Sequence, residues 1–300
     1  MLKDFNQLLA KVSTEVKKTI VVPMAQDADV LAALNKAFTA GLTDAVLTGP
    51  KSKIEQAARE NDIDLSSYEV IDMDDEIDCV RTSVNLVREG KAQVLMKGLC
   101  STANILRAVL NKERGLRKAK VLSHMAVFES PNYHKLLYMS DAAMNIAPDL
   151  NEKIAVTQNC LDALHALGYE KPKAAILSAV EKVNPAAMPS SADAAIIAKM
   201  AERGQIKNAV IDGPLALDNA ISPRANEIKG LVSPVGGDAD ICIVPNIETG
   251  NVFYKLMTIL GGAKVAGVIL GASAPVVLTS RADSDESKYL SIVTALAMSQ

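Results

Sequence analysis

Ser280 and Arg281 are the residues of this chain best suited to chemistry on an anion, because a hydroxyl donor and a guanidinium follow one another. They come after the longest apolar run, residues 265–278, and before a helical pattern that Asp283 can cap with Glu286 as capping-box partner. The run predicts a buried strand that delivers polar groups to its carboxyl end, where open α/β sheets bind ligands. A plain strand–loop–helix joint, with Arg281 paired to a nearby aspartate, is the structural alternative.

A second group suited to anion binding begins at Lys97, where a strand pattern ends and a helical pattern follows. Backbone N–H groups at a helix start lack partners within the helix and favour an anion, and Gly98 lets a ligand approach the backbone closely. Ser101 and Thr102 add hydroxyl groups, and Arg107 lies one to two turns into the helix, from where it can reach back. A capped helix with a solvated lysine and arginine is the alternative, and spacing alone leaves both open.

Four other polar residues are candidates for an anion-binding site. Ser123 and His124 end a further strand pattern, where a histidine can act as an acid, a base or an anion donor. Asn251 follows the strand pattern at 241–244, and Lys255 lies one turn further along a helical pattern. A satisfied structural histidine and polar residues that cap a turn are the alternatives.

Composition argues against several classes of protein. The net charge of −3 does not suit a binder of duplex nucleic acid, and the absence of tryptophan with 3% aromatic residues does not suit recognition by stacking. The longest apolar run is too short and too interrupted to span a bilayer. Four cysteines lie far apart without a Cys-x-x-Cys pair, and the chain opens on polar sequence. We therefore expect a cytoplasmic protein with reduced thiols, no metal site, no nucleic-acid partner and no membrane association.

Short β-branched segments alternate with amphipathic helical segments through the first third of the chain. Four strand patterns between residues 19 and 97 are each followed by a helical pattern, which predicts a parallel sheet covered on both faces. The rhythm changes at 121–129 and 136–139, two strand patterns joined by a short turn, which indicates a hairpin or a passage between domains. The predicted fold class is α/β, with parallel or mixed sheets and flanking helices.

An ordered set of short motifs runs through almost the whole chain. In chain order they are Met96-Lys97-Gly98, Ser101-Thr102, Leu106-Arg107, Ser140-Asp141-Ala142-Ala143, Asp212-Gly213-Pro214-Leu215, Asp218-Asn219-Ala220-Ile221, Pro245-Asn246, Gly250-Asn251, Tyr254-Lys255 and Leu278-Thr279-Ser280-Arg281-Ala282-Asp283-Ser284. With this set the chain resembles the phosphate acyltransferases, and it is more similar to their butyryl branch than to their acetyl branch.

The resemblance implies two α/β domains of the isocitrate-dehydrogenase-like architecture, residues 1–128 with 272–300 and residues 129–271, and an active site in the cleft between them. It implies the reversible reaction of acyl-CoA with phosphate to give acyl phosphate and free CoA, with butyryl or branched short acyl chains expected. The coenzyme A thioester is then a substrate, and no metal or redox cofactor is required. A homodimer or larger homo-oligomer is expected by analogy alone.

The same resemblance assigns roles to residues of this chain. Arg281 would hold the phosphoryl group bidentately, Arg107 would complete the clamp, and Ser280 would donate to the oxyanion or the leaving thiolate. Asp283 completes the catalytic set as the base we rank first. The positions expected to bind phosphate or CoA are Lys97, Gly98, Ser101, Thr102, Ser123, His124, Asn251 and Lys255.

One departure and two alternatives qualify this assignment. The acetyl branch carries an aspartate seven residues after the serine, whereas this chain has Ser287 there. Asp283, Asp285 and Glu286 are the nearby substitutes, of which we rank Asp283 first. A dehydrogenase of the same architecture, acting on a phosphorylated or carboxylated alcohol, is one alternative, although the chain has no Gly-x-Gly-x-x-Gly. A non-catalytic sensor of acyl-CoA or acyl phosphate is the other.

Overall fold

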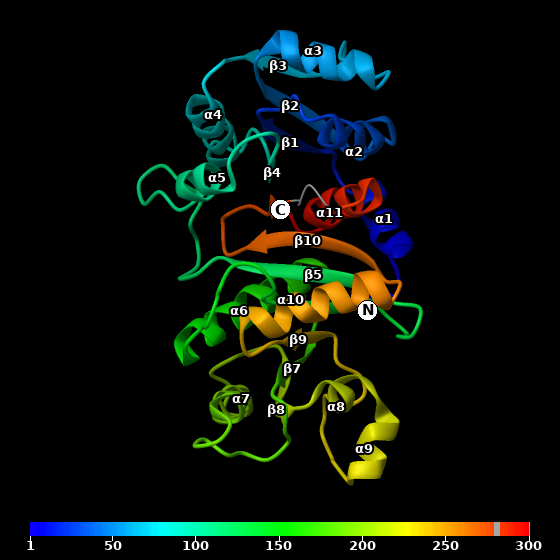
Figure 1. The fold of residues 1–300 in the computed structure, drawn as a ribbon, viewed down its shortest axis with the longest axis vertical. Helices are drawn as coiled ribbons and strands as arrows, with labels where there is room; N and C mark the ends of the chain where they lie inside the picture. Colours follow the sequence, from blue (N-terminus) through cyan, green and yellow to red (C-terminus); the bar gives the residue numbers. More distant parts are fainter. Residues whose placement is uncertain (279–282, 300) are drawn as a thin grey trace. The chain divides into compact units, whose positions relative to one another are not determined.

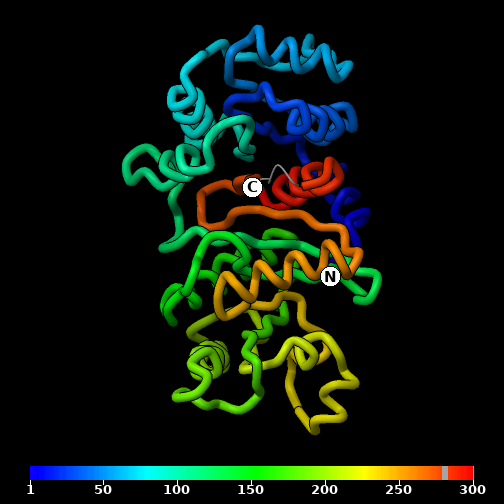
Figure 2. Tube along the Cα trace, viewed as in Figure 1, coloured from blue at the N-terminus to red at the C-terminus, as the bar shows by residue number. Residues whose placement is uncertain are grey.

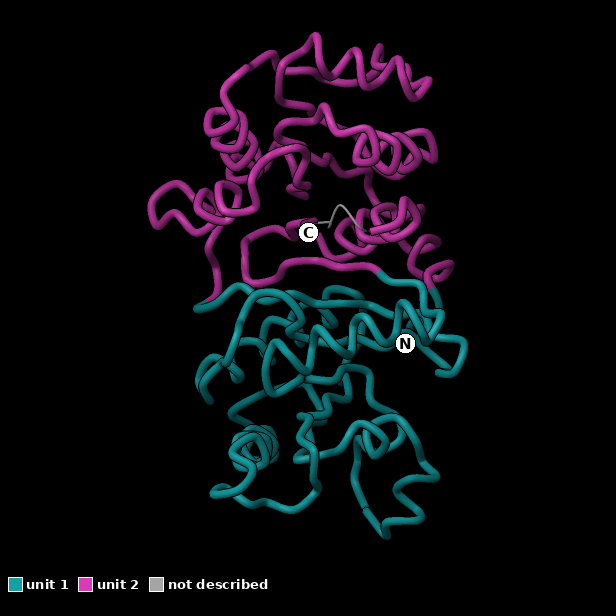
Figure 3. The backbone as a smooth tube through the Cα atoms, viewed as in Figure 1, with its two compact units in different colours: residues 1–4, 120–265 teal, residues 5–119, 266–300 magenta. Residues whose placement is uncertain are grey.

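The computed structural model of the chain describes residues 1–278 and 283–299. The chain divides into two units, which Figure 3 colours separately. Unit 1 comprises Met1–Asp4 and Lys120–Val265, and unit 2 comprises Phe5–Ala119 and Ala266–Gln300. Both units are α/β, which confirms the predicted fold class. The domain boundaries expected from the sequence, after residues 128 and 271, stay a prediction.

Unit 2 is built on a sheet in the order β3-β2-β1-β4-β11-β10, in which every pairing from β3 to β11 is parallel (Figure 1). Helices cover the sheet, as the alternation of strand and helix patterns predicts. Its elements are α1 (Phe5–Thr14), β1 (Lys18–Pro23), α2 (Ala28–Thr39), β2 (Thr43–Gly49), α3 (Lys51–Glu60), β3 (Glu69–Asp72), α4 (Glu76–Arg88), β4 (Val94–Met96), α5 (Thr102–Val109), β10 (Lys264–Leu270), β11 (Val276–Val277) and α11 (Asp285–Met298).

Local sequence signals set the helix starts in this unit. Asp27 caps α2 by accepting a hydrogen bond from the backbone N–H of Val30 at 3.1 Å, and Asp75 caps α4 through Asp78 at 2.9 Å. Each cap satisfies one of the N–H groups that a helix start leaves without an intrahelical partner. The helices therefore begin directly after the carboxyl ends of β1 and β3, and this fixes the turns at that edge of the sheet.

The apolar run at 265–278 forms two strands, not the single strand that we predicted. β10 and β11 are antiparallel, with Ile269 opposite Val276, and the chain reverses through Gly271, which has a φ of +91°. A positive φ favours glycine, so the reversal occurs where the run contains one. The prediction that the run ends at a strand's carboxyl end still holds for β11, and Figure 2 lets the reader follow this return of the chain in orange and red.

The start of α11 also differs from the prediction. The N-cap is Ser284, whose hydroxyl accepts a hydrogen bond from the backbone N–H of Ser287 at 3.2 Å. Asp283 therefore lies one residue before the cap, and Glu286 is not in the capping-box position. Aspartate and serine are nearly equal as N-caps, so two adjacent candidates could not be separated from the sequence.

Unit 1 has a mixed sheet in the order β5-β6-β9-β7-β8. β5 and β6 are antiparallel, which confirms the hairpin, one of the two alternatives predicted for these strands, and the other pairings are parallel. Its elements are β5 (Ser123–Glu129), β6 (Leu137–Ser140), α6 (Leu150–Ala166), β7 (Lys173–Leu177), α7 (Pro189–Glu202), β8 (Val210–Leu215), α8 (Leu217–Ile221), α9 (Pro223–Lys229), β9 (Ile241–Ile243), α10 (Ile247–Lys255) and the π-helix η1 (Leu256–Leu260). Among the described residues, no helix is both long and apolar enough to cross a bilayer.

A fully buried lysine joins the amino ends of three strands in unit 1. The ammonium of Lys135 lies 2.6 Å from the carboxylate of Asp240 and 2.8 Å from that of Asp238. Lys173 donates its backbone N–H to Asp240 and its ammonium to Asp238, each at 2.7 Å. Burial alone would raise the pKa of Asp238, but the hydrogen bonds from the two lysines outweigh it and hold this pKa well below its usual range. We call these four residues the Lys135 cluster.

Candidate functional site

The carboxyl ends of β4 and β11 lie side by side within unit 2, and each is followed in the chain by a predicted site segment. Val277 pairs with Met96 in parallel register, and the backbone N–H of Lys97 donates to the carbonyl of Val277 at 2.9 Å. Residue 278 therefore follows directly beside the turn that begins at Lys97. Ser280 and Arg281 themselves lie outside the described residues, so their predicted roles stay predictions.

Gly98 makes a close backbone contact, but with the protein itself. A Cβ at this position would collide with the carbonyl oxygens of Pro23 and Met24 at the end of β1. The next residue, Leu99, donates its backbone N–H to Met24 at 2.7 Å. Only glycine fits here, and its effect is to hold the Lys97 turn against β1. The glycine thus has a structural reason at this position, and its approach by a ligand stays a prediction.

The amides at the start of α5 are only partly available to an anion. The backbone N–H of Leu99 is taken by Met24, and that of Ser101 donates to the carboxylate of Glu76 at 2.8 Å. The expectation that the amides at this helix start are unpaired is therefore wrong for Ser101, because α4 supplies an acceptor from outside the helix. Within the described residues, no protein acceptor is found for Thr102 and Ala103, the first two residues of α5. These two amides still favour an anion.

Arg107 belongs to a short hydrogen-bonded relay that starts on α4. One carboxylate oxygen of Glu76 accepts from the side-chain amide of Asn104 at 2.7 Å, as well as from Ser101. The amide oxygen of Asn104 in turn accepts from a guanidinium N–H of Arg107 at 2.9 Å. Glu76 and Asn104 are half-buried, whereas Arg107 is exposed. We call Glu76, Asn104 and Arg107 the Arg107 relay.

Two residues of the relay were not among the predicted site residues. Asn104 lies three residues before Arg107 on the same helix, a spacing at which side chains meet, so a local signal was present. Glu76 is 28 residues from Asn104 in the chain, and only the packing of α4 against α5 brings them together. No local pattern could have shown that contact.

Lys97 and Cys100 differ in what they offer to chemistry. Lys97 is half-buried, and its ammonium donates to the carbonyl of Gly98 at 3.1 Å. Burial raises the pKa of the Cys100 thiol to about 11, in spite of the opposing effect of Lys97. The thiol therefore stays protonated at neutral pH and is a poor nucleophile, whereas Lys97 places a positive charge beside the turn.

In unit 1, Ser123 and His124 open strand β5 instead of ending a strand. Ser123 is fully buried, and its hydroxyl accepts a hydrogen bond from the side-chain amide of Asn159 at 3.1 Å. His124 is only 9% exposed, and the ring of Tyr254 stands edge-on to it at a centroid distance of 6.1 Å. These contacts favour the structural alternative for Ser123, and the binding role of both residues stays a prediction.

Asn251 and Lys255 lie one turn apart on α10, and both are exposed. The helix packs so closely against the turn after β6 that a Cβ on Gly250 would collide with the carbonyl oxygen of Asp141. That aspartate is buried and accepts backbone hydrogen bonds from Ala143 and Met144 at 2.9 and 3.0 Å, so it shapes a turn. The predicted residues of unit 1 thus come from one strand and one helix.

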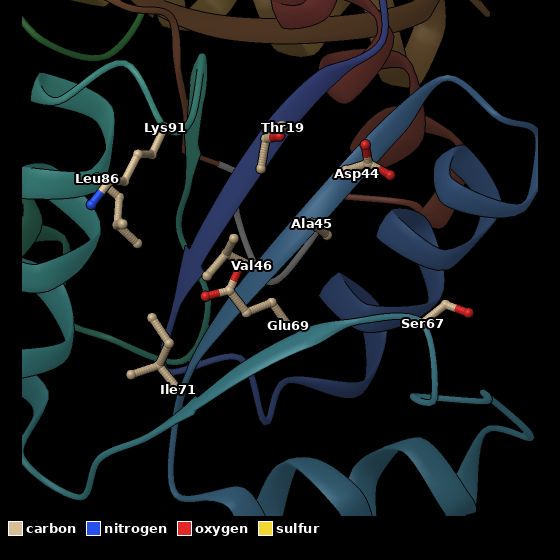
Figure 4. A pocket seen from close by; sticks show the side chains of 9 residues that line it. All are labelled: Thr19, Asp44, Ala45, Val46, Ser67, Glu69, Ile71, Leu86 and Lys91. Carbon is tan, nitrogen blue, oxygen red and sulfur yellow. The ribbon is translucent and has the colours of Figure 1, made fainter.

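A cavity of about 600 Å³ lies at the opposite end of the unit 2 sheet from the Lys97 turn. Figure 4 shows its lining side chains, which come largely from the amino halves of β1, β2 and β3 and from the end of α4. They are Thr19, Asp44, Ala45, Val46, Ser67, Glu69, Ile71, Leu86 and Lys91. None is a predicted site residue, and parallel sheets bind ligands at their carboxyl ends, so we do not place the site in this cavity.

The fold is one shared by phosphotransacylases and by some dehydrogenases. The structure of a branched-chain phosphotransacylase from Enterococcus faecalis V583 is similar with a TM-score of 0.83 and 35% identity, over 94% of this chain and 98% of that one. A 4-hydroxythreonine-4-phosphate dehydrogenase from Klebsiella pneumoniae is similar with a TM-score of 0.59, over 94% of this chain and all of that one. At 13% identity the second similarity concerns the fold alone.

The chain belongs to the phosphate acetyl/butaryl transferase family, which matches residues 4–82 and 75–296. It is 47% identical over 295 residues to the phosphate butyryltransferase of Clostridium acetobutylicum, and the match covers 98% of both chains. These findings confirm the resemblance read from the motifs and make the chain an acyltransferase. They do not favour the dehydrogenase alternative.

Proposed function

We propose that the chain catalyses reversible transfer of a short acyl group, butyryl or branched, between coenzyme A and inorganic phosphate. The observation that carries the proposal is the pairing of β4 with β11, which sets residue 278 beside Lys97 in a chain whose motifs follow the family order. The butyryl preference is supported by the 47% identity to a phosphate butyryltransferase. The expectation that the site lies between two domains stays a prediction.

The proposed reaction needs charge stabilisation more than it needs a cofactor. A phosphate oxygen attacks the thioester carbonyl carbon, a C–O bond forms, the tetrahedral oxyanion collapses, and the C–S bond breaks to release the CoA thiolate. No atom changes oxidation state, and the thiolate takes up a proton when it becomes free CoA. Fixed cations and hydrogen-bond donors aimed at the phosphate and the oxyanion lower the barrier to such a reaction.

In this proposal Arg281 grips phosphate bidentately, and Arg107 and Lys97 neutralise its remaining charge. Ser280 donates to the oxyanion, and a single donor of this kind is worth about 3 kcal/mol of transition-state stabilisation. Asp283 is the base for the thiol in the reverse direction. Ser284 holds the cap of α11, which removes the competing role that we had considered for Asp283.

The direct test is release of thiol from butyryl-CoA with and without phosphate. We expect phosphate-dependent release, with butyryl-CoA or a branched short acyl-CoA used better than acetyl-CoA. No release above background with any short acyl-CoA would contradict the proposal. CoA binding without turnover would indicate a sensor, and release that does not depend on phosphate would indicate thioester hydrolysis.

We further propose that the chain acts in the cytoplasm as a homodimer or larger homo-oligomer. The four cysteines are all buried free thiols, as suits a reducing compartment. On α10 and η1 the side chains of Val252, Leu256, Ile259 and Leu260 are 49–80% exposed. We take a second copy of the chain as their partner, because it would present the same exposed apolar side chains and could cover them across a two-fold contact.

Light scattering with Ile259→Glu tests the association. A charge buried at the contact should shift the chain toward monomers. Val232→Glu is the matched control, since Val232 is 97% exposed elsewhere in unit 1. An unchanged mass for Ile259→Glu would remove this surface from the proposal, and a monomeric wild type would remove the oligomer.

A further inference from the structure

We infer that Glu76 and Asn104 are positioning residues that hold the Arg107 guanidinium ready for the phosphate substrate. The inference rests on the proposed function, and it extends that function to two residues with no assigned role. Neither residue needs to touch a substrate. Their effect is to restrict an exposed arginine, whose many rotamers would otherwise have to be ordered when phosphate binds.

The geometry of the Asn104 side chain fixes the direction of the relay. Its NH2 group donates to the Glu76 carboxylate at 2.7 Å, so its oxygen faces Arg107, from which it accepts at 2.9 Å. The flipped amide would set its oxygen against a carboxylate and its NH2 against a guanidinium, which loses both hydrogen bonds. Glu76 therefore determines that Asn104 presents an acceptor to the arginine.

The same Glu76 oxygen also holds the turn that precedes α5. It accepts the backbone N–H of Ser101 at 2.8 Å, so one carboxylate fixes both the end of the Lys97 turn and the relay to Arg107. Glu76 is the first residue of α4, where a negative charge is favourable, and it stays half-buried. The first turn of α4 thus sets the separation between two parts of the proposed phosphate clamp.

Arg107 keeps most of its hydrogen-bonding capacity for a ligand. Of its five N–H donors, one is used by Asn104. An arginine held by a single hydrogen bond to a neutral amide retains its charge, whereas a carboxylate partner would compete with phosphate. Asparagine at position 104 therefore suits a positioning role better than aspartate does.

The kinetic test uses Asn104→Ala, Arg107→Ala and the double variant, with KM measured separately for phosphate and for acyl-CoA. Asn104→Ala should raise KM for phosphate about 10-fold, below the ~10²-fold that a 1 Å misplacement can cost. KM for acyl-CoA should change less than about 2-fold, since only the phosphate contact is disturbed. In the Arg107→Ala background, Asn104→Ala should add almost nothing.

Three further variants separate positioning from stabilisation of the helix. Asp75→Ala removes the cap of α4 but keeps Glu76, Asn104 and Arg107, so it should lower stability and raise KM for phosphate less than Asn104→Ala does. Glu76→Gln keeps an oxygen acceptor and should retain the wild-type KM for phosphate, whereas Glu76→Ala should behave like Asn104→Ala. An equal rise in KM for Asp75→Ala, or full additivity of Asn104→Ala with Arg107→Ala, would overturn the inference.

A measurement without turnover distinguishes this inference from the proposed function. The Arg107 guanidinium signal in ¹⁵N spectra can be assigned through its loss in Arg107→Lys. In Asn104→Ala it should move to the position of solvent-exposed arginines, whether or not the protein releases thiol. An unchanged signal would overturn the positioning role even if the enzyme proved fully active.

Discussion

The Lys135 cluster and the Arg107 relay are two polar groups, one in each unit, that differ in where they lie along their strands. The Lys135 cluster joins the amino ends of β6, β7 and β9, and its central ammonium is completely enclosed. The Arg107 relay lies after the carboxyl end of β4 and terminates in an exposed guanidinium. The Lys135 cluster has its central charge buried, whereas the Arg107 relay leaves the charge of Arg107 exposed to solvent.

This difference suggests that the Lys135 cluster serves stability and that the Arg107 relay serves binding. Buried ions must be paired, and the enclosed ammonium of Lys135 is held by Asp238 and Asp240, so this charge is not available to a substrate. Ligands of parallel sheets bind at the carboxyl ends, where a cation held by a neutral amide can still meet an anion. Substitutions in the first network should therefore act on unfolding, and substitutions near the second should act on kinetics.

The largest effect on stability is expected for Lys135→Met. Removing the lysine leaves Asp240, only 3% exposed, without its cation, and breaking a buried pair typically destabilises a protein by about 3–5 kcal/mol. Urea unfolding should show a lower midpoint with an unchanged slope. The matched control is Lys173→Met, a half-exposed partner of Asp238, for which a smaller loss is expected. Equal losses for the two variants would mean that burial is not what distinguishes the cluster.

The largest effect on activity is expected for Arg281→Ala. If this arginine grips phosphate, kcat/KM for phosphate should fall about 10²–10³-fold, by analogy with the loss of a single oxyanion donor, while the thermal midpoint stays the same. Arg281→Lys should recover only part of the loss, because an ammonium lacks the planar fork. Steady-state kinetics with varied phosphate measure both. Unchanged kinetics would remove Arg281 from the site and leave Arg107 as the principal arginine to consider.

The parts of this fold that sequence could predict are those with local causes. Period-2 and period-3.6 apolar patterns gave the strands and helices, and the turn between 129 and 136 gave the hairpin. The apolar run at 265–278 was predicted to be one strand, because an apolar segment does not by itself show where the chain reverses direction. Its reversal at Gly271 depends on which neighbours pair with each half, β4 with β11 in this case.

The candidate site was predictable to the same degree. We could propose Lys97, Ser101, Thr102 and Arg107 because strand ends and helix starts are local features, and their roles stay predictions. The partner of Ser101 was missed, because Glu76 reaches it only through the packing of α4 on α5. The backbone N–H of Ser101 was therefore expected to be unpaired, although it donates to Glu76. A sequence pattern shows the donors but not the acceptors that folding brings to them.

Acid should weaken the Lys135 cluster through Asp238. Its pKa is lower in the folded chain than in the unfolded chain, so its contribution to stability is complete above about pH 4 and is lost as the pH falls toward the folded value. Asp238→Asn should be less stable than the wild type at neutral pH, and the two should converge as the pH falls below about 4. Thermal midpoints measured across that range test this. A constant difference down to acid pH would show that the carboxylate charge does not matter.

The smallest effect expected concerns the adjacent residues Asp283 and Ser284. Ser284→Ala removes the cap of α11 and should lower the free energy of unfolding by about 1 kcal/mol with little change in turnover. Asp283→Ala leaves the cap intact, so its loss of stability should be smaller than that of Ser284→Ala. It should slow the reverse reaction, in which the CoA thiol must lose its proton. Urea unfolding and initial rates with acyl phosphate and CoA separate the two. If Asp283→Ala instead lost stability and kept its rate, the aspartate would belong with the structural charges, and the thiol, with an ordinary pKa near 8.5, would need no base of its own.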